Sequence, residues 1–402
     1  MADFGATDLD AFRKDVREQL QAMYPAELRQ TDSGSDPEAV WGGRTFTGSG
    51  DPQIIWMNRM AAKGWTTPTW PREYGGGGMT ADEARIFEQE MAVGKYRPPV
   101  LAFGIWMLGP VLMEYATEAQ KQTHLRRIVN GEVRWCQGYS EPGAGSDLAA
   151  LATRCEDKGD QWLINGSKVW TSYADKADWC FCLVRTDATK KHEGISFVLI
   201  DMGSPGVDTR PIQLISGESP FCETFFTDVK IPKENLVGRV NGGWEIAKRL
   251  LQYERQNISA GFGEGGGTAG GASGDLATMA RSYGALPDAD LRKRITTNKM
   301  DFQALRQTIN RSAAESRAGN GPSAATSIIK YAAAEFAKER SELMIEALGH
   351  QGLGWDGEGY DPPEVGAVRG WLRTKANSIE GGTSEVNLNV IAKRVLGLPD
   401  MK

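Results

Sequence analysis

The chain has 402 residues, a formal net charge of −6 at pH 7 and five cysteines. That length can bury a large core in about two or three subdomains, and an acidic balance without a dense basic run argues against nucleic acid as a partner. The N-terminus lacks an apolar run of signal-peptide length, and no stretch approaches the roughly eighteen apolar residues of a membrane span. We therefore expect a cytoplasmic protein that does not bind a membrane.

The first third of the chain is predicted to be helical. From Asp8, a suitable helix cap, to Tyr24, apolar residues recur at spacings of three and four, which is typical of an amphipathic helix. The stretch 81–130 repeats that pattern, with a break at Pro98-Pro99. Between these helical stretches, the Pro and Gly content of 64–78 predicts a loop, whose two tryptophans either pack into the fold or contact a ligand.

The hydrophobic period changes to two between residues 133 and 237, which predicts an antiparallel sheet domain. Asn165-Gly166 lies between two strand-like runs, WLI and SKVW, and this dipeptide favours a tight hairpin. Cys180 and Cys182 alternate along another such run and share one face. Because the sequence has no paired CxxC and no metal-ligand spacing, we interpret these cysteines as small apolar fillers and expect no metal site.

From Gly242 onward the pattern is helical again, and two long helices are predicted, at 242–260 and 323–348. The second carries its apolar residues along one stripe, as expected for a member of a helix bundle. The glycine-rich segment 261–274 contains a chance GxGxxG. It follows a helix and precedes no strand, so a flexible connection is favoured over a dinucleotide site.

One carboxylate stands on the apolar face of the helix at 242–260. Glu254 follows Leu250 by four residues and precedes Ile258 by four, so the three share a face. A carboxylate there is costly to desolvate unless it is paired. Two interpretations remain open: an ordinary glutamate bonded to a partner such as Arg249 or a residue of another helix, or a desolvated general base for a weakly acidic C–H.

Two segments concentrate turn glycines, hydroxyls and a tryptophan: WCQGYSEPGAGSDLA at 135–149 and NGSKVWTS at 165–172. Their backbone N–H groups and hydroxyls suit a flat ligand with a polar edge. Both segments resemble the flavin-contacting core of the acyl-CoA dehydrogenase family. The resemblance extends over nearly the whole chain, through GWTTPTWPREYGGGG (64–78), GPVLMEYATEAQKQTHLRRIVNGE (109–132) and SIEGGTSEVNLNVIAKRVLGLP (378–399).

The resemblance implies an α+β architecture of three domains. These are an α-helical N-terminal domain at 1–132, a β-barrel-like middle domain at 133–238 and a C-terminal four-helix bundle at 239–402, which in this family also builds the subunit interface. It also implies the activity, an FAD-dependent α,β-desaturation of an acyl-CoA thioester. The α-proton leaves as H⁺ and a β-hydrogen passes as hydride to flavin N5. An electron-transfer flavoprotein is the expected acceptor.

In this family the catalytic base occupies one of two positions. Most members place it in a C-terminal YEGTS motif, which here reads Glu380-Gly381-Gly382-Thr383-Ser384, so that Gly381 occupies the base position. Isovaleryl- and long-chain-type members place a Glu directly before an Arg in the helix after the sheet, and here that pair is Glu254-Arg255. We therefore assign the base to Glu254, keep Glu380 as a second candidate, and expect the Gly381 N–H to polarise the thioester carbonyl.

The remaining site residues follow position by position from the same resemblance. The expected cofactor-binding residues are Tyr139 and Ser140 on the pyrimidine side of the flavin, Trp170, Thr171 and Ser172 around the isoalloxazine, and Thr383 and Glu385 at the adenosine diphosphate end. The expected substrate-binding residues are Ser146 and Arg255.

Two elements of the FAD site depart from the family pattern. The family's Arg-x-x-Phe-Gly appears as ARSYG, with the cofactor-binding candidate Arg281 displaced by one position, and Glu346 stands where a Gln is usual. FAD sites in this family are shared between subunits. We therefore expect a dimer or tetramer, either a homo-oligomer or a hetero-oligomer in which a different chain supplies these groups. The local resemblance favours the large-subunit, pimeloyl-CoA-dehydrogenase-like branch.

Two other functions remain open on this scaffold. One is a flavin oxidase or monooxygenase that reacts with O₂, and the other is a non-catalytic subunit that lends FAD contacts to a partner. Glu254 discriminates between catalysis and inertness, because an inert subunit has no reason to keep a carboxylate on an apolar stripe.

Overall fold

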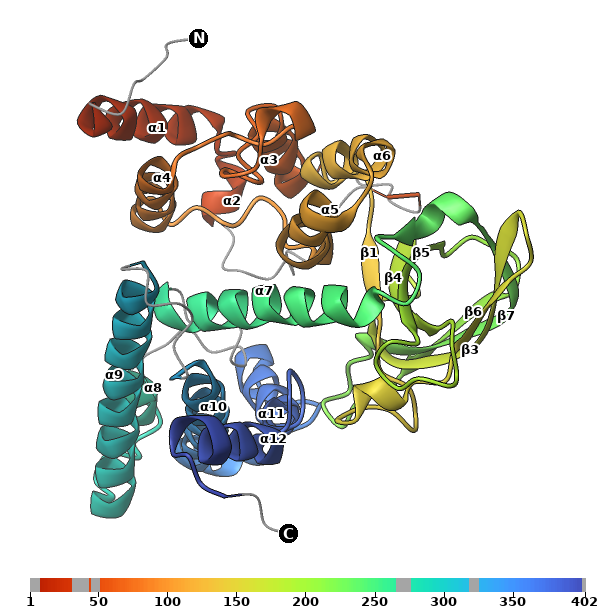
Figure 1. Cartoon of the computed structure of the whole chain (residues 1–402). Coiled ribbons are helices and arrows are strands. Elements are labelled where there is room, and N and C mark those ends of the chain that lie inside the picture. The colour runs from red at the N-terminus through yellow and green to blue at the C-terminus, as the bar shows by residue number, and fades with distance from the viewer. Residues whose placement is uncertain (1–7, 31–42, 45–50, 265–275, 318–324, 400–402) are drawn as a thin grey trace. The chain divides into compact units, whose positions relative to one another are not determined.

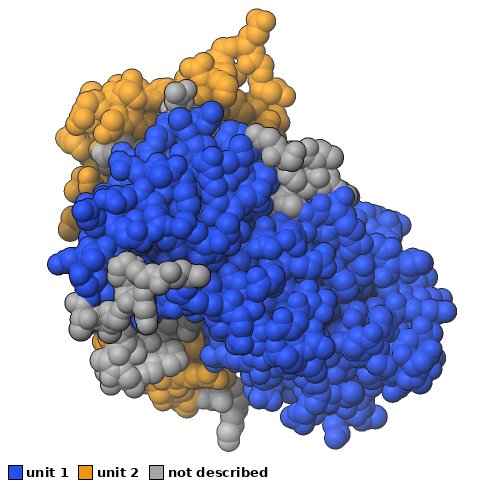
Figure 2. All heavy atoms as spheres, turned by 90° about the horizontal axis from the view of Figure 1, so that it is seen from above, with its two compact units in different colours: residues 1–212, 220–253 blue, residues 213–219, 254–402 orange. Residues whose placement is uncertain are grey.

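The structure is a computed structural model of the chain, which describes residues 8–30, 43–44, 51–264, 276–317 and 325–399. The chain divides into two compact units, coloured separately in Figure 2: unit 1 comprises 1–212 and 220–253, and unit 2 comprises 213–219 and 254–402. None of the helices in the described ranges is long and apolar enough to cross a bilayer.

Unit 1 begins with helices whose starts follow the capping rules. The Asp8 side chain accepts a backbone N–H at 2.8 Å, which confirms the predicted cap. Thr80 and Thr117 each open a helix with a reciprocal capping box. The predicted break at Pro98-Pro99 lies between the fourth helix and a π-helical turn at Gly104–Leu108. The helices (Figure 1) are α1 (Leu9–Met23), α2 (Glu27–Gln30), α3 (Pro52–Ala61), α4 (Ala81–Val93), α5 (Gly109–Tyr115) and α6 (Glu118–Val129).

The two tryptophans of the 64–78 loop are core residues. The Trp65 ring meets Phe87 of α4 edge-on, with 5.4 Å between ring centroids. Trp70 is 7% exposed, and a Cβ on Gly109, the first residue of α5, would lie 1.9 Å from its ring. Close packing therefore requires the glycine, and of the two interpretations of these tryptophans the structure favours packing into the fold.

The sheet of unit 1 is mixed. Its strands are β1 (Trp135–Gly138), β2 (Arg154–Asp157), β3 (Gln161–Ser172), β4 (Trp179–Arg185), β5 (Ile195–Asp201), β6 (Val207–Ile212), β7 (Phe221–Pro232) and β8 (Leu236–Val237). They follow the order β6-β7-β3-β2-β4-β5-β8, with β1 beside β4. Most neighbours are antiparallel, but β1 and β2 run parallel to β4, so the expectation of an antiparallel sheet was wrong for these strands. Neither is joined to β4 by a short turn, and long connections permit parallel pairing.

Asn165-Gly166 does not form the predicted hairpin, and that prediction was wrong. β3 continues through the dipeptide, and its register with β7 slips there to form a bulge. A tight I′ turn needs a positive φ at both central residues, whereas of these two only Gly166 has one, at 150°. A Cβ on Gly166 would lie 2.7 Å from Thr153, so the bulge brings two backbones close together. The Asn165 side chain donates to Asp228 on β7 at 3.0 Å.

One hydrophobic core joins the N-terminal helices, the sheet and the first part of α7 (Gly243–Glu264). Leu112 of α5, Phe181 of β4 and Leu250 of α7 are fully buried in it. A second core, formed by the alternate residues of β4 and its neighbours, contains all five cysteines, which are buried and unbonded. Burial raises the pKa of the Cys182 thiol well above its usual value, as fits the predicted role of apolar filler.

Unit 2 is helical. Besides the end of α7, its helices are α8 (Leu276–Ser282), α9 (Ala289–Arg317), α10 (Ala325–Leu348), α11 (Pro362–Thr374) and α12 (Ser384–Val390). α10 packs against each of the other four. Ile329, Ala333 and Ala337 are at most 3% exposed, which confirms the predicted apolar stripe of this helix. Of the glycine-rich segment, residues 261–264 extend α7 and 265–274 lie outside the described ranges.

Candidate active site

Trp170 lies at a break in strand β3. The register between β3 and β7 shifts between Lys168 and Thr171, and Trp170 has a left-handed backbone there, with a φ of 61°. This conformation is costly for a bulky residue and persists only where its surroundings enforce it. The indole is 55% exposed and meets Phe221 edge-on, with ring centroids 6.0 Å apart. The bulge thus holds a flat aromatic surface open to a ligand.

Hydroxyl groups lie around this bulge. Thr171 is fully buried, and its Oγ1 has no hydrogen-bond partner among the residues that the structure describes. Ser172, the last residue of β3, and Ser140, in the loop after β1, are half-buried. The Ser140 carbonyl accepts the N–H of Val169 at 2.9 Å, which joins the loop to the bulged strand. Three candidate hydroxyls are therefore gathered beside Trp170.

The loop after β1 turns tightly at Glu141 and Ala144, whose backbones exchange hydrogen bonds of 3.1 and 3.0 Å. A Cβ at Gly143 or Gly145 would meet nothing within 4 Å. Ser146 follows in an exposed position. Packing within the chain therefore does not explain the two glycines, and the turn presents bare backbone and a hydroxyl on its outer side.

Tyr139 differs from its neighbours in this loop because its side chain belongs to the core. The residue is 5% exposed, and its ring meets Phe181 of β4 edge-on at 6.1 Å. The predicted cofactor contact of Tyr139 stays a prediction.

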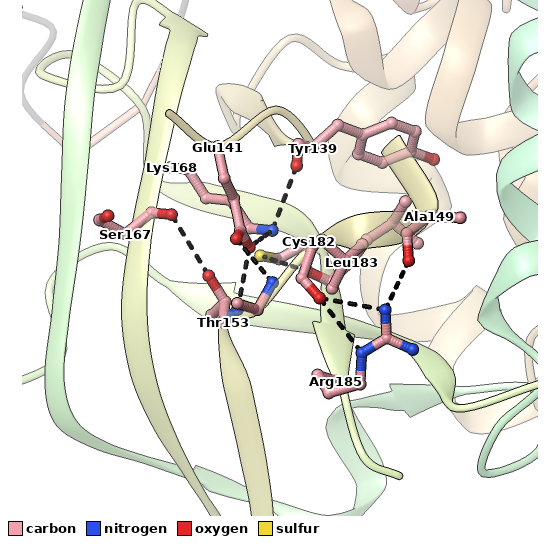
Figure 3. A network of polar contacts seen from close by, with 11 residues as sticks. Tyr139, Glu141, Ala149, Thr153, Ser167, Lys168, Cys182, Leu183 and Arg185 are labelled. Carbon is pink, nitrogen blue, oxygen red and sulfur yellow. Dashed lines mark hydrogen bonds and ion pairs between the residues drawn. The ribbon is translucent and has the colours of Figure 1, made fainter. Parts of the chain in front are cut away.

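A buried ion pair lies beneath the loop (Figure 3). The fully buried Lys168 ammonium donates to the Glu141 carboxylate at 2.7 Å and to the Tyr139 carbonyl at 3.1 Å. The same carboxylate accepts the backbone N–H groups of Ala152 and Thr153, at 2.6 and 2.9 Å. Three donors therefore converge on one carboxylate, and both charges of the pair are compensated inside the protein.

The environment keeps this carboxylate ionised. Burial by itself would raise the pKa of Glu141, but the Lys168 charge and the hydrogen bonds outweigh burial and hold that pKa below its ordinary value. Arg185 on β4 fixes the next part of the loop, since its guanidinium donates to the carbonyls of Ala149 and Leu151 at 2.6 and 3.0 Å. Both ends of the loop are thus tied to the sheet.

Glu254 lies on α7, is half-buried, and is the first residue of that helix that belongs to unit 2. Arg249, which the sequence offered as a partner for Glu254, bonds both oxygens of the Glu114 carboxylate at 2.6 to 3.0 Å. The Tyr253 hydroxyl also donates to Glu114. The Arg255 side chain lies outside the described part of the structure, so its predicted substrate contact stays a prediction.

The C-terminal segment places the second candidate base in an ion pair. Arg373 of α11 donates to both oxygens of Glu380, at 3.2 and 2.8 Å. The next two residues, Gly381 and Gly382, have left-handed backbones, with φ of 63° and 97°. Glycine adopts this conformation without steric cost, whereas a side chain at either position would strain the turn. The Gly381 N–H accordingly belongs to a turn of two glycines, Gly381 and Gly382, which carry no side chains of their own.

The candidates for the far end of the cofactor lie at helix termini in unit 2. Thr383 caps α12 by accepting a first-turn N–H at 3.2 Å, and Glu385 is exposed in that first turn. Arg281 is exposed in the last turn of α8. Gly381, Thr383 and Glu385 therefore lie close together in one segment of the chain, while Glu254 and Arg281 come from separate helices.

Of the residues at the two departures from the family pattern, Tyr283 of the ARSYG motif and Glu346 have partners inside unit 2, while the displaced Arg281 is exposed. Tyr283 donates its hydroxyl to Glu364 of α11 at 2.8 Å. Glu346 of α10 is paired with Arg294 of α9, which also bonds Asp290 at 2.9 Å. Each altered side chain is thus satisfied by a neighbouring helix.

Sequence reasoning missed the three charged residues that hold the site in unit 1: Glu141, Lys168 and Arg185. One signal was available, because Lys168 occupies a position of β3 that alternation assigns to the inner face, where an ammonium requires an anion. The residues brought together in unit 1 also fit the expected flavin. Trp170 offers a ring face, and the unpartnered Thr171 hydroxyl and the half-buried serines offer polar groups at its edge.

Comparison with known proteins finds members of one family along nearly the whole chain. Three family models match in succession: acyl-CoA dehydrogenase N-terminal domain at residues 7–132, middle domain at 136–229 and C-terminal domain at 241–396. Acyl-CoA dehydrogenase IpdE1 of Mycobacterium tuberculosis is 38% identical over 402 residues, which covers 98% of both sequences. Among solved structures, the Tcur3481-Tcur3483 steroid ACAD has a TM-score of 0.77 at 26% identity, and the ChsE4-ChsE5 complex from Mycobacterium tuberculosis has 0.71 at 27%, each over 100% of both chains.

Proposed function

Because this chain belongs to the acyl-CoA dehydrogenase family, an enzyme class whose members use FAD, we propose that it introduces an α,β-double bond into an acyl-CoA thioester with Glu254 as general base. One observation carries the choice of base. The alternative carboxylate, Glu380, is held by Arg373 through bonds of 3.2 and 2.8 Å. Both oxygens of that carboxylate are engaged by the guanidinium, so Glu380 would have to leave Arg373 before it could approach a substrate.

The cofactor contacts in this proposal come from the loop after β1 and the end of β3. Ser140 and Ser172 would bond the polar edge of the flavin, and Trp170 would cover one of its faces, which its exposed ring supports. When bound, FAD supplies an acceptor for the β-hydrogen of the substrate as hydride. Thr383, Glu385 and Arg281 would hold the adenosine diphosphate end.

The chain's own residues supply the proton chemistry. The Glu254 carboxylate takes the α-proton of the thioester, and its half-buried position favours transfer from a weak carbon acid because water solvates it less. The N–H of Gly381 donates to the thioester oxygen, where negative charge grows as the proton leaves. Ser146 and Arg255 orient the acyl-CoA so that the α-carbon faces the base.

We also propose that a second, different chain completes the cofactor site. Glu346 is paired with Arg294, and Tyr283 with Glu364, which leaves the displaced Arg281 as the group that the altered motif offers to a phosphate. Two of the similar solved structures are named for two proteins each, and one of them is a steroid ACAD. A polycyclic or dicarboxylic acyl-CoA is accordingly the first substrate class to test. The cytoplasmic location and the electron-transfer flavoprotein acceptor rest on the sequence and stay predictions.

The test is anaerobic reduction of the purified protein, alone and with its partner chain, by a panel of acyl-CoA thioesters. The wild type should be yellow and should bleach with one class of thioester. Glu254→Gln should keep its flavin and lose bleaching by about a hundredfold or more.

The matched control is Glu380→Gln, which removes the other candidate carboxylate and should bleach at close to the wild-type rate. The reverse pattern would move the base to Glu380. Bleaching in both variants would show that neither Glu254 nor Glu380 is by itself the required base. Reoxidation by O₂ that outpaces reoxidation by an electron-transfer flavoprotein would favour the oxidase.

A further inference from the structure

The bulge that carries Trp170 is not held by the β3–β7 ladder. Lys168 pairs with Thr224 and Thr171 pairs with Cys222, so Val169 and Trp170 fall in the gap between these pairs. A residue in a sparsely populated backbone conformation needs support from outside its own strand. Support for this gap comes from the loop after β1.

Three hydrogen bonds join that loop to β3 in the gap or directly beside it. Val169 donates its N–H to the Ser140 carbonyl at 2.9 Å, and the Lys168 ammonium reaches back to the carbonyl of Tyr139 at 3.1 Å and to Glu141 at 2.7 Å. Glu141 in turn holds the end of the loop through two backbone N–H groups, at 2.6 and 2.9 Å. Figure 3 shows the bonds that Lys168 makes to Tyr139 and Glu141.

We infer that the Glu141–Lys168 ion pair is a positioning device for the flavin ring, which fixes the loop carrying Ser140 at a set distance from the bulge carrying Trp170. This inference rests on the proposed function, because only a bound flavin needs the loop and the bulge to keep one spacing. Both members act through the residues they hold, and neither is assigned a place in the reaction itself.

Stability alone does not account for the pair. Replacing a buried ion pair by apolar groups of similar volume is often neutral, so such a pair is weak evidence for a stabilising role. An ammonium that donates to two acceptors within 3.1 Å instead fixes a direction, which an apolar contact does not do. The pair therefore differs from filler in the geometry that it imposes.

The experiment compares Glu141→Gln, Lys168→Met and the double variant in the flavin-loaded protein. Each single variant leaves one buried charge uncompensated and should be less stable. The double variant removes both charges and should recover part of that stability. Its flavin absorption and circular dichroism bands should nevertheless differ from those of the wild type. Its kcat should fall roughly tenfold to a hundredfold, with a smaller change in KM.

A readout without flavin follows the chain itself. Amide hydrogen exchange at Ala152 and Thr153 in the flavin-free protein should accelerate in the double variant, because the glutamine of Glu141→Gln offers one carbonyl oxygen where two carboxylate oxygens accept now. The control is Glu90→Gln, which removes another buried carboxylate of unit 1, on α4, from its pairs with the more exposed Arg13 and Arg17 of α1. It should lower stability and leave the flavin bands and kcat as they are.

A double variant with wild-type flavin bands, kcat and exchange rates would overturn the inference and leave the pair as core structure. Altered bands in Glu90→Gln would also overturn it, since any loss of stability would then produce the signal. A wild-type protein that binds no flavin, alone or with its partner, would instead reject the proposed function, and the positioning role with it. The wild-type spectrum distinguishes that failure from failure of the pair.

Discussion

The two units use their charged residues in opposite ways. In unit 1, Glu141 and Lys168 are buried beneath the loop after β1, while Trp170, at the bulge of β3, is exposed. In unit 2, Glu346, at a position expected near the cofactor, is paired with Arg294, and both side chains are partly exposed. The difference teaches that a motif position serves a ligand only where neighbouring side chains have not already satisfied it.

The largest effect is expected from a substitution at the bulge of β3 in unit 1. Gly166→Val places a side chain at a φ of 150° and within 2.7 Å of Thr153, so the strand must shift. We expect a loss of about 3 kcal/mol in the free energy of unfolding, measured by urea titration. Gly143→Ala in the open turn is the control and should change stability by less than about 0.5 kcal/mol. Equal effects would show that the bulge is not a constrained feature.

The next effect is a loss of folding stability in mild acid, which arises in unit 1. Burial, with a smaller contribution from the Arg127 charge, lowers the pKa of His124 on α6 from 6.5 to about 4. The unfolded chain therefore takes up the proton first, so stability is fully present above pH 6.5 and falls as the pH drops toward 4. The linkage amounts to about 2 kcal/mol by pH 5.

His124→Phe should remove that acid-dependent loss, because a neutral ring then lies between Trp135 and Trp179, each now 5.3 Å from the imidazole. The measurement is the urea midpoint of the variant and the wild type at neutral and mildly acidic pH. Identical pH profiles for the two proteins would contradict the assignment of this slope to His124.

A smaller effect, on FAD affinity, is expected from a substitution in unit 2. Glu346→Gln removes the carboxylate from the position where the family has an amide, and frees Arg294 from its pair. We expect FAD to bind up to about tenfold more tightly in the assembled protein, measured by fluorescence titration, with little change in stability. The control is Glu342→Gln on the same helix, which breaks a pair with Lys375 at the end of α11. Unchanged FAD affinity would mean that this position does not face the cofactor.

The smallest effect concerns the anchor of α7. Tyr253→Phe removes the hydroxyl that donates to Glu114 while the Arg249 pair remains. Burial, with help from Glu114, raises the pKa of Tyr253 to about 12, so the substitution changes no charge at neutral pH. We expect a loss of about 1 kcal/mol or less in stability and a few-fold lower kcat, because Glu254 is the next residue. A loss of a hundredfold would show that Tyr253 acts on the substrate directly.

Local patterns predicted the elements of the fold well. The cap at Asp8, the break at Pro98-Pro99 and the apolar stripe of α10 all depend on neighbours within a few residues, which the sequence displays. The hairpin predicted at Asn165-Gly166 does not form, because pairing of β3 with β2 and β7 on both sides outweighs a local turn preference. The prediction of antiparallel neighbours around β4 was wrong for a related reason, because the direction of these strands depends on long connections.

The site was predictable only in part. The sequence located the loop and strand that carry Ser140 and Trp170, because turn glycines and hydroxyls stand out in a motif. It did not locate the pair beneath them, since Glu141 and Lys168 are 27 residues apart and only the folded sheet brings them to 2.7 Å. The roles assigned to Glu254 and Gly381 remain predictions, tested by the reduction experiment above.

The cysteines provide a way to observe each unit by itself. All five lie in unit 1, where they are buried, and burial raises the pKa of Cys155 to about 12. Alkylating reagents attack the thiolate, so the folded sheet should resist labelling until it opens. The labelling rate is therefore a clock for opening of the sheet. A cysteine introduced at an exposed position of unit 2 would carry a spectroscopic probe without competition from the native thiols.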